Sequence, residues 1–185
     1  MNGTSKKEEN MDNLAETLKA AIREIPDWPK QGILFYDITT LLKQGKCFAQ
    51  AIDALTAPYK DKKIDVVLGM EARGFIFAPT VAYALGAGFV PVRKPGKLPA
   101  EKLQVNYELE YGTDSLEIHK DAIVPGQRAL IVDDLIATGG TAKAVAEMTN
   151  SMGATVVGLA FLVELAFLNG REKVGGYAIH SVLKY

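Results

Sequence analysis

An apolar run that ends in two acids and a glycine turn, residues 129–141, strongly limits the folds open to this chain. Its first four residues are Ala-Leu-Ile-Val, a stretch typical of a parallel strand that is covered on both faces. Asp133 and Asp134 come where such a strand leaves its sheet, and open α/β sheets place their ligands at that end. We therefore expect a central strand of a parallel sheet with a polar site at its carboxyl end.

The glycine turn has small side chains, so backbone N–H groups can approach an anion closely. Apolar residues then recur at helical spacing as far as Gly153, which places the turn at a helix N-terminus, where the dipole favours negative charge. A terminal phosphate fits this turn, and the two acids suit ribose hydroxyls or a bound cation. The alternative is a solvated turn between strand and helix, which is what two adjacent aspartates most often form when no other motif accompanies them. The turn comprises Ala137, Thr138, Gly139, Gly140 and Thr141.

The chain from residue 64 onward alternates apolar strands with helices, and such β-α-β units imply parallel pairing. Residues 93–120 interrupt the alternation with basic residues, prolines and segments around Gly112 that predict a flexible β-hairpin loop. The expected fold class is α/β, with a doubly wound, mostly parallel sheet flanked by helices, a hood and this hairpin. The expected elements are strands over 64–69, 89–92, 155–163 and 178–183, and a crossover helix over 75–85.

The N-terminal region predicts two helices and a stiff loop. Asn13 and Glu16 have capping-box spacing ahead of an apolar face that a proline ends, and residues 46–59 predict a second helix. Between them, residues 26–37 combine prolines with aromatic side chains that can stack on a ligand. The polar residues 1–12 are expected to be disordered.

Composition bounds the class of protein. A chain of 185 residues with 48% apolar content can bury one core, so we expect a single domain over residues 13–185. A net charge of −1 without a basic, aromatic-rich stretch argues against nucleic acid, and no apolar run is long enough to span a membrane. Cys47 is the single cysteine, which excludes an internal disulfide and makes a reducing cytoplasm the expected location.

The segment 132–141 resembles the 5-phosphoribosyl 1-pyrophosphate (PRPP) motif of the type I phosphoribosyltransferases. The similarity covers nearly all of residues 13–185, and its details are closest to the members of that family that act on adenine. It is carried by five further motifs, at residues 32–35, 69–75, 92–99, 109–112 and 116–119.

The resemblance implies the reaction of adenine with PRPP to give AMP and pyrophosphate. It implies Mg²⁺ carried on PRPP without a direct protein ligand, and a homodimer in which part of the hood comes from the neighbouring subunit. It assigns the ribose and the 5-phosphate to Asp133, Asp134, Ala137, Thr138, Gly139, Gly140 and Thr141.

The pyrophosphate is assigned by the same resemblance to the loop 69–74, with Glu71, Ala72 and Arg73, and a cis peptide bond is expected between Glu71 and Ala72. Lys97 and Lys94 are expected to close over the pyrophosphate. The alternatives are a surface ion pair for Arg73 and a solvated basic turn for the two lysines.

For proton transfer, the resemblance singles out Glu110, beside Tyr111, because the purine must lose an imidazole proton to a base as its other ring nitrogen attacks. Related enzymes for oxo-purines carry an aspartate where this chain has Ala137. The alternative for Glu110 is a solvent-exposed charge without a catalytic role, which its position in a hairpin would favour without the resemblance. The adenine pocket is assigned to Ile33, Phe35 and Leu135, although Phe35 is equally suited to a core, and Tyr36 departs from the arginine usual in the family.

Two alternative functions remain open from the sequence. One is a phosphoribosyltransferase for another purine, which Ala137 opposes for the oxo-purines. The other is a PRPP-binding regulator of the same fold that binds nucleic acid. Such a regulator should carry a basic face or an added DNA-binding segment, and the near-neutral charge argues against it.

Overall fold

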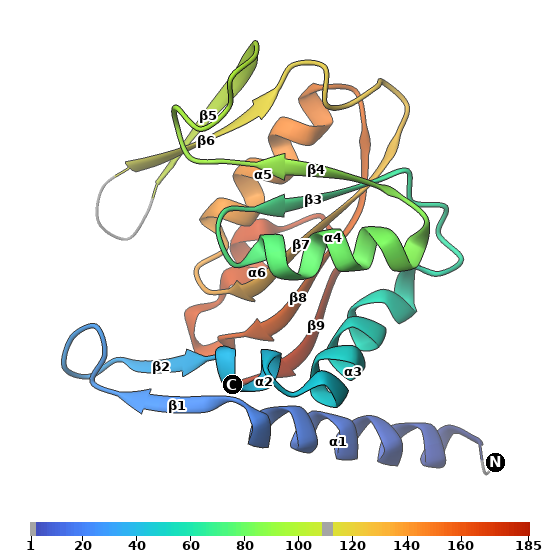
Figure 1. Ribbon diagram of the computed structural model, residues 1–185, viewed down its shortest axis with the longest axis vertical. Coiled ribbons are helices and arrows are strands. Elements are labelled where there is room, and N and C mark those ends of the chain that lie inside the picture. The colour runs from blue at the N-terminus through green and yellow to red at the C-terminus, as the bar shows by residue number, and fades with distance from the viewer. Residues whose placement is uncertain (1–2, 109–112) are drawn as a thin grey trace. The chain divides into compact units, whose positions relative to one another are not determined.

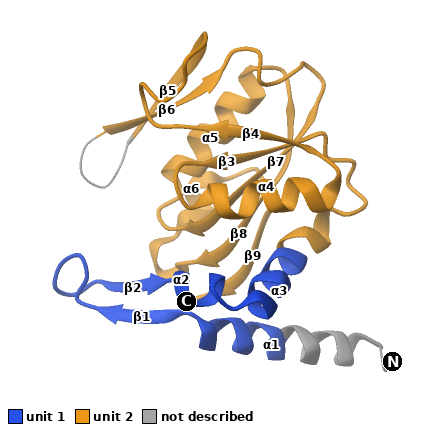
Figure 2. Ribbon diagram, in the orientation of Figure 1, with its two compact units in different colours: residues 1–54 blue, residues 55–185 orange. Residues whose placement is uncertain are grey.

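The computed structural model describes the backbone of residues 3–108 and 113–185, and the side chains of residues 12–107 and 113–185. The chain divides into two compact units, residues 1–54 and residues 55–185 (Figure 2). Within the described ranges, every helix is too short or too polar to cross a membrane.

The larger unit is built on five parallel strands in the order β4-β3-β7-β8-β9 (Figure 1). The chain moves outward from β3 to β4 and then, from β7 onward, in the opposite direction. This reversal between β3 and β7 is the topological switch point of a doubly wound sheet, so the predicted fold class is confirmed. The strands are β3 (Val66–Met70), β4 (Gly88–Val92), β7 (Arg128–Ile136), β8 (Thr155–Glu164) and β9 (Ile179–Lys184).

Helices cover both faces of this sheet because parallel strands are joined by right-handed crossovers, and the crossovers on the two sides of the switch point run in opposite directions. Figure 1 shows α4 in front of the strands and α5 behind them. The connecting elements are α4 (Gly74–Leu85), α5 (Gly140–Ser151), α6 (Gly170–Val174) and the 3-10 turns η1 (Ala57–Tyr59) and η2 (Ala166–Leu168).

The centre of the sheet is fully buried, as the apolar run predicts. Leu130 and Ile131 point to opposite faces of β7, and neither is exposed to solvent. One detail differs from the prediction: β7 runs to Ile136, so Asp133 and Asp134 lie within the strand instead of after it. The difference arises because β8 continues to pair with β7 up to Ile136, whereas the pairing with β3 ends at Val132.

The predicted hairpin is present as β5 (Lys102–Glu108) and β6 (Thr113–His119), which pair antiparallel. Its connecting residues 109–112 lie outside the described residues. A bridge between Arg93 and Glu117 joins the hairpin to the end of β4.

The smaller unit begins with a helix that is longer than expected. It runs from Gly3, so Asn13 lies inside it, and the predicted capping box is wrong. Residues 4–12 contain neither glycine nor proline, and they extend the helix through the segment that was expected to be disordered. The segment predicted as a stiff loop, residues 26–37, comprises the end of β1, the connecting residues 27–33 and all of β2 of an antiparallel hairpin. The elements are α1 (Gly3–Ala21), β1 (Arg23–Pro26), β2 (Leu34–Asp37), α2 (Thr39–Leu42) and α3 (Gly45–Thr56).

Candidate active site

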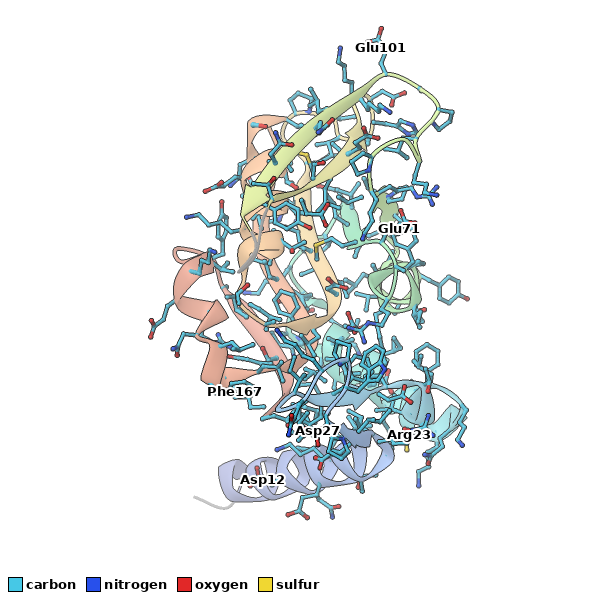
Figure 3. The ribbon with its side chains drawn as sticks, turned by 90° about the vertical axis from the view of Figure 1, so that its left-hand side faces the viewer. Asp12, Arg23, Asp27, Glu71, Glu101 and Phe167 are labelled. Carbon is cyan, nitrogen blue, oxygen red and sulfur yellow. The ribbon has the colours of Figure 1, made fainter. Side chains whose placement is uncertain are left out.

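The loop after β3 begins with the expected cis peptide bond between Glu71 and Ala72. The Glu71 carboxylate, labelled in Figure 3, accepts hydrogen bonds from Arg93 Nε and Nη2, each at 3.1 Å, and from the Lys94 amide at 3.2 Å. These bonds, those of Arg93 foremost, lower the pKa of Glu71. The carboxylate therefore holds the residues directly after β4 against the loop after β3.

Arg73 closes the same loop, directly before α4, and reaches across the switch point to β7. Its Nε lies 2.8 Å from Asp134 Oδ2. That oxygen is buried and accepts no hydrogen bond from the described residues, so the contact is an attraction between charges without hydrogen-bond geometry. The pair joins the two loops that were assigned to pyrophosphate and to ribose.

Asp133 lies on the opposite face of β7 from Asp134, against the start of α4. A Cβ atom added at Gly74 would lie 2.6 Å from Asp133 Oδ1, so a glycine is required for this approach. The same oxygen accepts a hydrogen bond of 2.9 Å from the Asp134 amide.

The guanidinium of Arg73 lies near both acids and lowers the pKa of each, but burial has a larger effect in the opposite direction. Burial, followed by the charge of Asp134, raises the pKa of Asp133 well above its usual range. Burial also raises the pKa of Asp134, and the charge of Arg73 opposes that rise. The site thus keeps two carboxylates that gain from hydroxyl donors or a cation at the end of β7.

The glycine turn leads into α5 as expected. Gly139 has φ +80°, a left-handed conformation, and Gly140 is the first residue of the helix. The Lys143 amide donates the first helical bond, to Gly139 O. The amides of residues 140–142 precede it and form the positive end of the helix, which suits a phosphate.

A cavity of about 370 Å³ lies between the two loops. Its lining brings together nearly all the residues predicted for the ribose, the 5-phosphate and the pyrophosphate. They are Glu71, Ala72, Arg73, Lys94, Asp133, Asp134, Ala137, Thr138, Gly139, Gly140 and Thr141. Leu135, which was predicted for the adenine pocket, also lines the cavity.

Other predicted residues lie elsewhere. Lys97 is exposed and is not part of the lining; its carbonyl accepts a bond of 3.1 Å from Arg93. Ile33 and Phe35 belong to the unit 1–54, where Phe35 packs edge-on against Trp28. Glu110 and Tyr111 lie outside the described residues, so their catalytic roles stay predictions.

Tyr107 and Asp114 of the hairpin were not predicted, yet both line the cavity. They pair across β5 and β6, and the Tyr107 hydroxyl donates to Asp114 Oδ2 at 3.3 Å and also bonds Thr141. The alternation of side chains along the hairpin could have identified these two residues. Val105 and Leu116 pack on the core, and Tyr107 and Asp114 lie two residues away along each strand, on the same face.

Three comparisons with known proteins agree with this geometry. A family model described as a phosphoribosyl transferase domain matches residues 39–176. The chain therefore belongs to the phosphoribosyltransferase family.

Within that family, two adenine phosphoribosyltransferases match over nearly the whole chain. The chain is 64% identical to the adenine phosphoribosyltransferase of Solibacter usitatus over 91% of its own length and 97% of the relative. It is 58% identical to that of Koribacter versatilis, over 92% and 93%. It belongs with the adenine phosphoribosyltransferases.

Solved structures support the same placement. The crystal structure of adenine phosphoribosyltransferase from Thermoanaerobacter pseudethanolicus matches with a TM-score of 0.89 and 57% identity, over 92% of this chain and 99% of that one. The Saccharomyces cerevisiae enzyme, in complex with an imino-altritol bisphosphate and adenine, matches with a TM-score of 0.87 and 43% identity, over 93% and 99%.

Proposed function

We propose that this chain transfers the phosphoribosyl group of PRPP to adenine and releases AMP and pyrophosphate. The observation that carries the choice of adenine is the 64% identity to an adenine phosphoribosyltransferase across nearly the whole of both chains. The cavity between the loops after β3 and β7 supplies places for a sugar, a phosphate and a leaving anion.

The glycine turn binds the 5-phosphate in this proposal. The first-turn amides of α5 donate to the phosphate oxygens, with the hydroxyls of Thr138 and Thr141 beside them. Asp133 and Asp134 accept hydrogen bonds from the ribose hydroxyls, which offsets the cost of burying two carboxylates.

Arg73 and the backbone of the loop after β3 bind the pyrophosphate. As the bond from C1 of the ribose to the pyrophosphate oxygen breaks, negative charge grows on the leaving group and positive charge on the sugar. The guanidinium stabilises the first of these charges, and the carboxylates of β7 stabilise the second.

Mg²⁺ enters this scheme as part of the substrate. The residues present fit such an ion, because Asp133 and Asp134 line the cavity and carboxylate oxygens are among the donors that Mg²⁺ prefers. When bound, the ion neutralises phosphate charge.

The adenine end is proposed from the resemblance. Glu110 takes the imidazole proton of the purine while another ring nitrogen attacks C1, and Tyr111 lies beside it in sequence. Ile33, Phe35 and Leu135 hold the base, and Leu135 also lines the cavity. Holding base and sugar in line can lower the barrier by about 7–11 kcal/mol, more than one residue contributes. We further propose that the enzyme works in the cytoplasm as a homodimer.

Pyrophosphate release from PRPP and Mg²⁺, measured with adenine, hypoxanthine, guanine or xanthine, tests the proposal. Release with adenine alone supports it. Release only with an oxo-purine would mean that the base is misassigned, and no release with any purine would favour the PRPP-binding regulator.

A further inference from the structure

The glycine turn rests on a second backbone segment, the start of α6, which is not part of the cavity lining. A Cβ atom added at Gly170 would lie 2.1 Å from Ala137 O and 3.0 Å from Gly139 N. One added at Gly139 would lie 2.3 Å from Gly170 O. Backbone therefore packs directly on backbone, and neither position has space for a side chain.

The place of this second segment is set by the residue that follows Gly170. Arg171 donates to both oxygens of Glu164, from Nε at 3.1 Å and from Nη2 at 2.6 Å, and to Ile179 O from Nη1 at 2.9 Å. Glu164 is the last residue of β8 and is 6% exposed. The guanidinium thus joins α6 to the last residue of β8 and the first residue of β9.

Glu164 is tied in turn to the residue directly before the glycine turn. It pairs in register with Ile136, and the next amide, of Leu165, donates to Ile136 O at 3.0 Å. Ile136 directly precedes Ala137, whose carbonyl contacts Gly170. These contacts form a closed ring from Ile136 through Glu164 and Arg171 back to the turn.

We propose that Gly170 and the Glu164–Arg171 ion pair, together called the brace, are positioning residues for the 5-phosphate of PRPP. The inference rests on the proposed function of the glycine turn. An amide nest binds an anion only while its N–H groups converge on it. A misplacement of about 1 Å at a site that positions substrate can lower the reaction rate up to ~10²-fold. The contacts of the brace described above reach the turn and the strands β7, β8 and β9, and none of them reaches the loop after β3. We therefore expect its effect to be confined to the phosphoribosyl end of the substrate.

Gly170→Ala is the direct test, with ribose 5-phosphate and pyrophosphate titrated separately into the whole protein by calorimetry. We expect the Kd for ribose 5-phosphate to rise about tenfold to a hundredfold, and the Kd for pyrophosphate to stay within about twofold, since the other loop is untouched. Gly45→Ala is the matched control, because Gly45 also opens a helix and a Cβ there meets nothing within 4 Å.

The ion pair gives a second, milder test that holds even if Gly170→Ala does not fold. Arg171→Met and Glu164→Gln should each raise the Kd for ribose 5-phosphate and the KM for PRPP several-fold, with the KM for adenine unchanged. Arg171→Lys should restore part of the loss. Arg23→Met removes a similar pair with a largely buried carboxylate, Asp37, and should lower thermal stability without changing ribose 5-phosphate affinity.

The outcomes separate this inference from the proposed function. A wild-type protein that releases pyrophosphate with adenine, beside folded variants with unchanged ribose 5-phosphate affinity, overturns the brace alone. Equal losses for ribose 5-phosphate and pyrophosphate also overturn it, because they indicate general destabilisation. A wild-type protein that neither releases pyrophosphate nor binds ribose 5-phosphate overturns the proposed function and the brace together.

Discussion

The loops after β3 and β7 meet at one cavity but are held in different ways. The loop after β3 is fixed by charged side chains, with Glu71 bonded to Arg93 and Arg73 paired with Asp134. The turn after β7 is fixed by close backbone packing against Gly170. We therefore expect that one loop can exchange its charge partners when a ligand arrives, whereas the backbone packing of the other leaves it little freedom to change shape.

This difference matches what each loop is proposed to bind. A pyrophosphate leaves during the reaction, so side chains that can return to internal partners suit its release. A 5-phosphate stays with the sugar through the reaction, and a preorganised nest costs little reorganisation when it binds. Substitutions should therefore act sharply on the turn after β7 and more gradually on the loop after β3.

The largest expected effect is that of Gly139→Ala. The new Cβ would lie 2.3 Å from a backbone oxygen, at a residue with φ +80°, so the nest must distort. We expect kcat/KM for PRPP to fall about 10²–10³-fold, measured as pyrophosphate release with adenine. Gly126→Ala controls for backbone conformation, since Gly126 has φ +90° with nothing near its Cβ position. An equal loss in both variants would contradict the packing argument.

Arg73→Gln should have a smaller and more selective effect. The neutral side chain cannot balance the charge of the leaving group, so we expect pyrophosphate affinity to fall about tenfold to a hundredfold. Ribose 5-phosphate affinity should change much less, because the nest after β7 does not depend on Arg73. Calorimetric titration of each ligand measures both, and unchanged pyrophosphate affinity would remove Arg73 from that subsite.

The sequence predicts the sheet and most of the cavity for a local reason. Strands and the glycine turn follow from patterns that span only a few residues, such as the apolar run before Asp133. The brace could not be predicted in this way. Glu164 lies beside Ile136 only because β7 pairs with β8, and Arg171 is connected to Ile136 only through its ion pair with Glu164. Tyr107 was missed because its partner Thr141 is distant in the chain.

The start of α1 was misjudged for a different physical reason. The capping-box spacing of Asn13 and Glu16 predicts a helix start, but a polar stretch without glycine or proline continues the helix equally well. Within α1, the Asn13 carbonyl accepts a bond of 2.8 Å from the side-chain hydroxyl of Thr17, one turn further along the helix. A local capping pattern therefore does not exclude a longer helix.

Asp133→Asn should stabilise the unliganded protein while it weakens ribose binding. Burial raises the folded-state pKa of Asp133, so the charged carboxylate disfavours folding at neutral pH, and this cost is absent below the unfolded pKa of about 3.9. We expect a gain of about 0.5–2 kcal/mol in unfolding free energy at pH 7 that disappears as the pH falls toward 4. Denaturant unfolding at several pH values checks this, with exposed Asp53→Asn as the control.

The smallest expected effect concerns the side-chain partners of the loop after β3. Glu71→Gln removes a partly exposed charge pair with Arg93, so the unfolding free energy should fall by about 0.2–1 kcal/mol at pH 7. The pKa of Glu71 is lowered by Arg93, so the pair stabilises the fold above the unfolded pKa of about 4.3 and loses that effect as the pH falls through the lower folded value. The difference between wild type and Glu71→Gln should therefore vanish in acid.

Glu101→Gln is the matched control. Glu101, labelled in Figure 3, pairs with Lys120, but its side chain is 84% exposed and the pair should contribute almost nothing. A loss of several kcal/mol in Glu71→Gln would mean that the loop after β3 is as rigidly built as the turn after β7, and the contrast between them would fail.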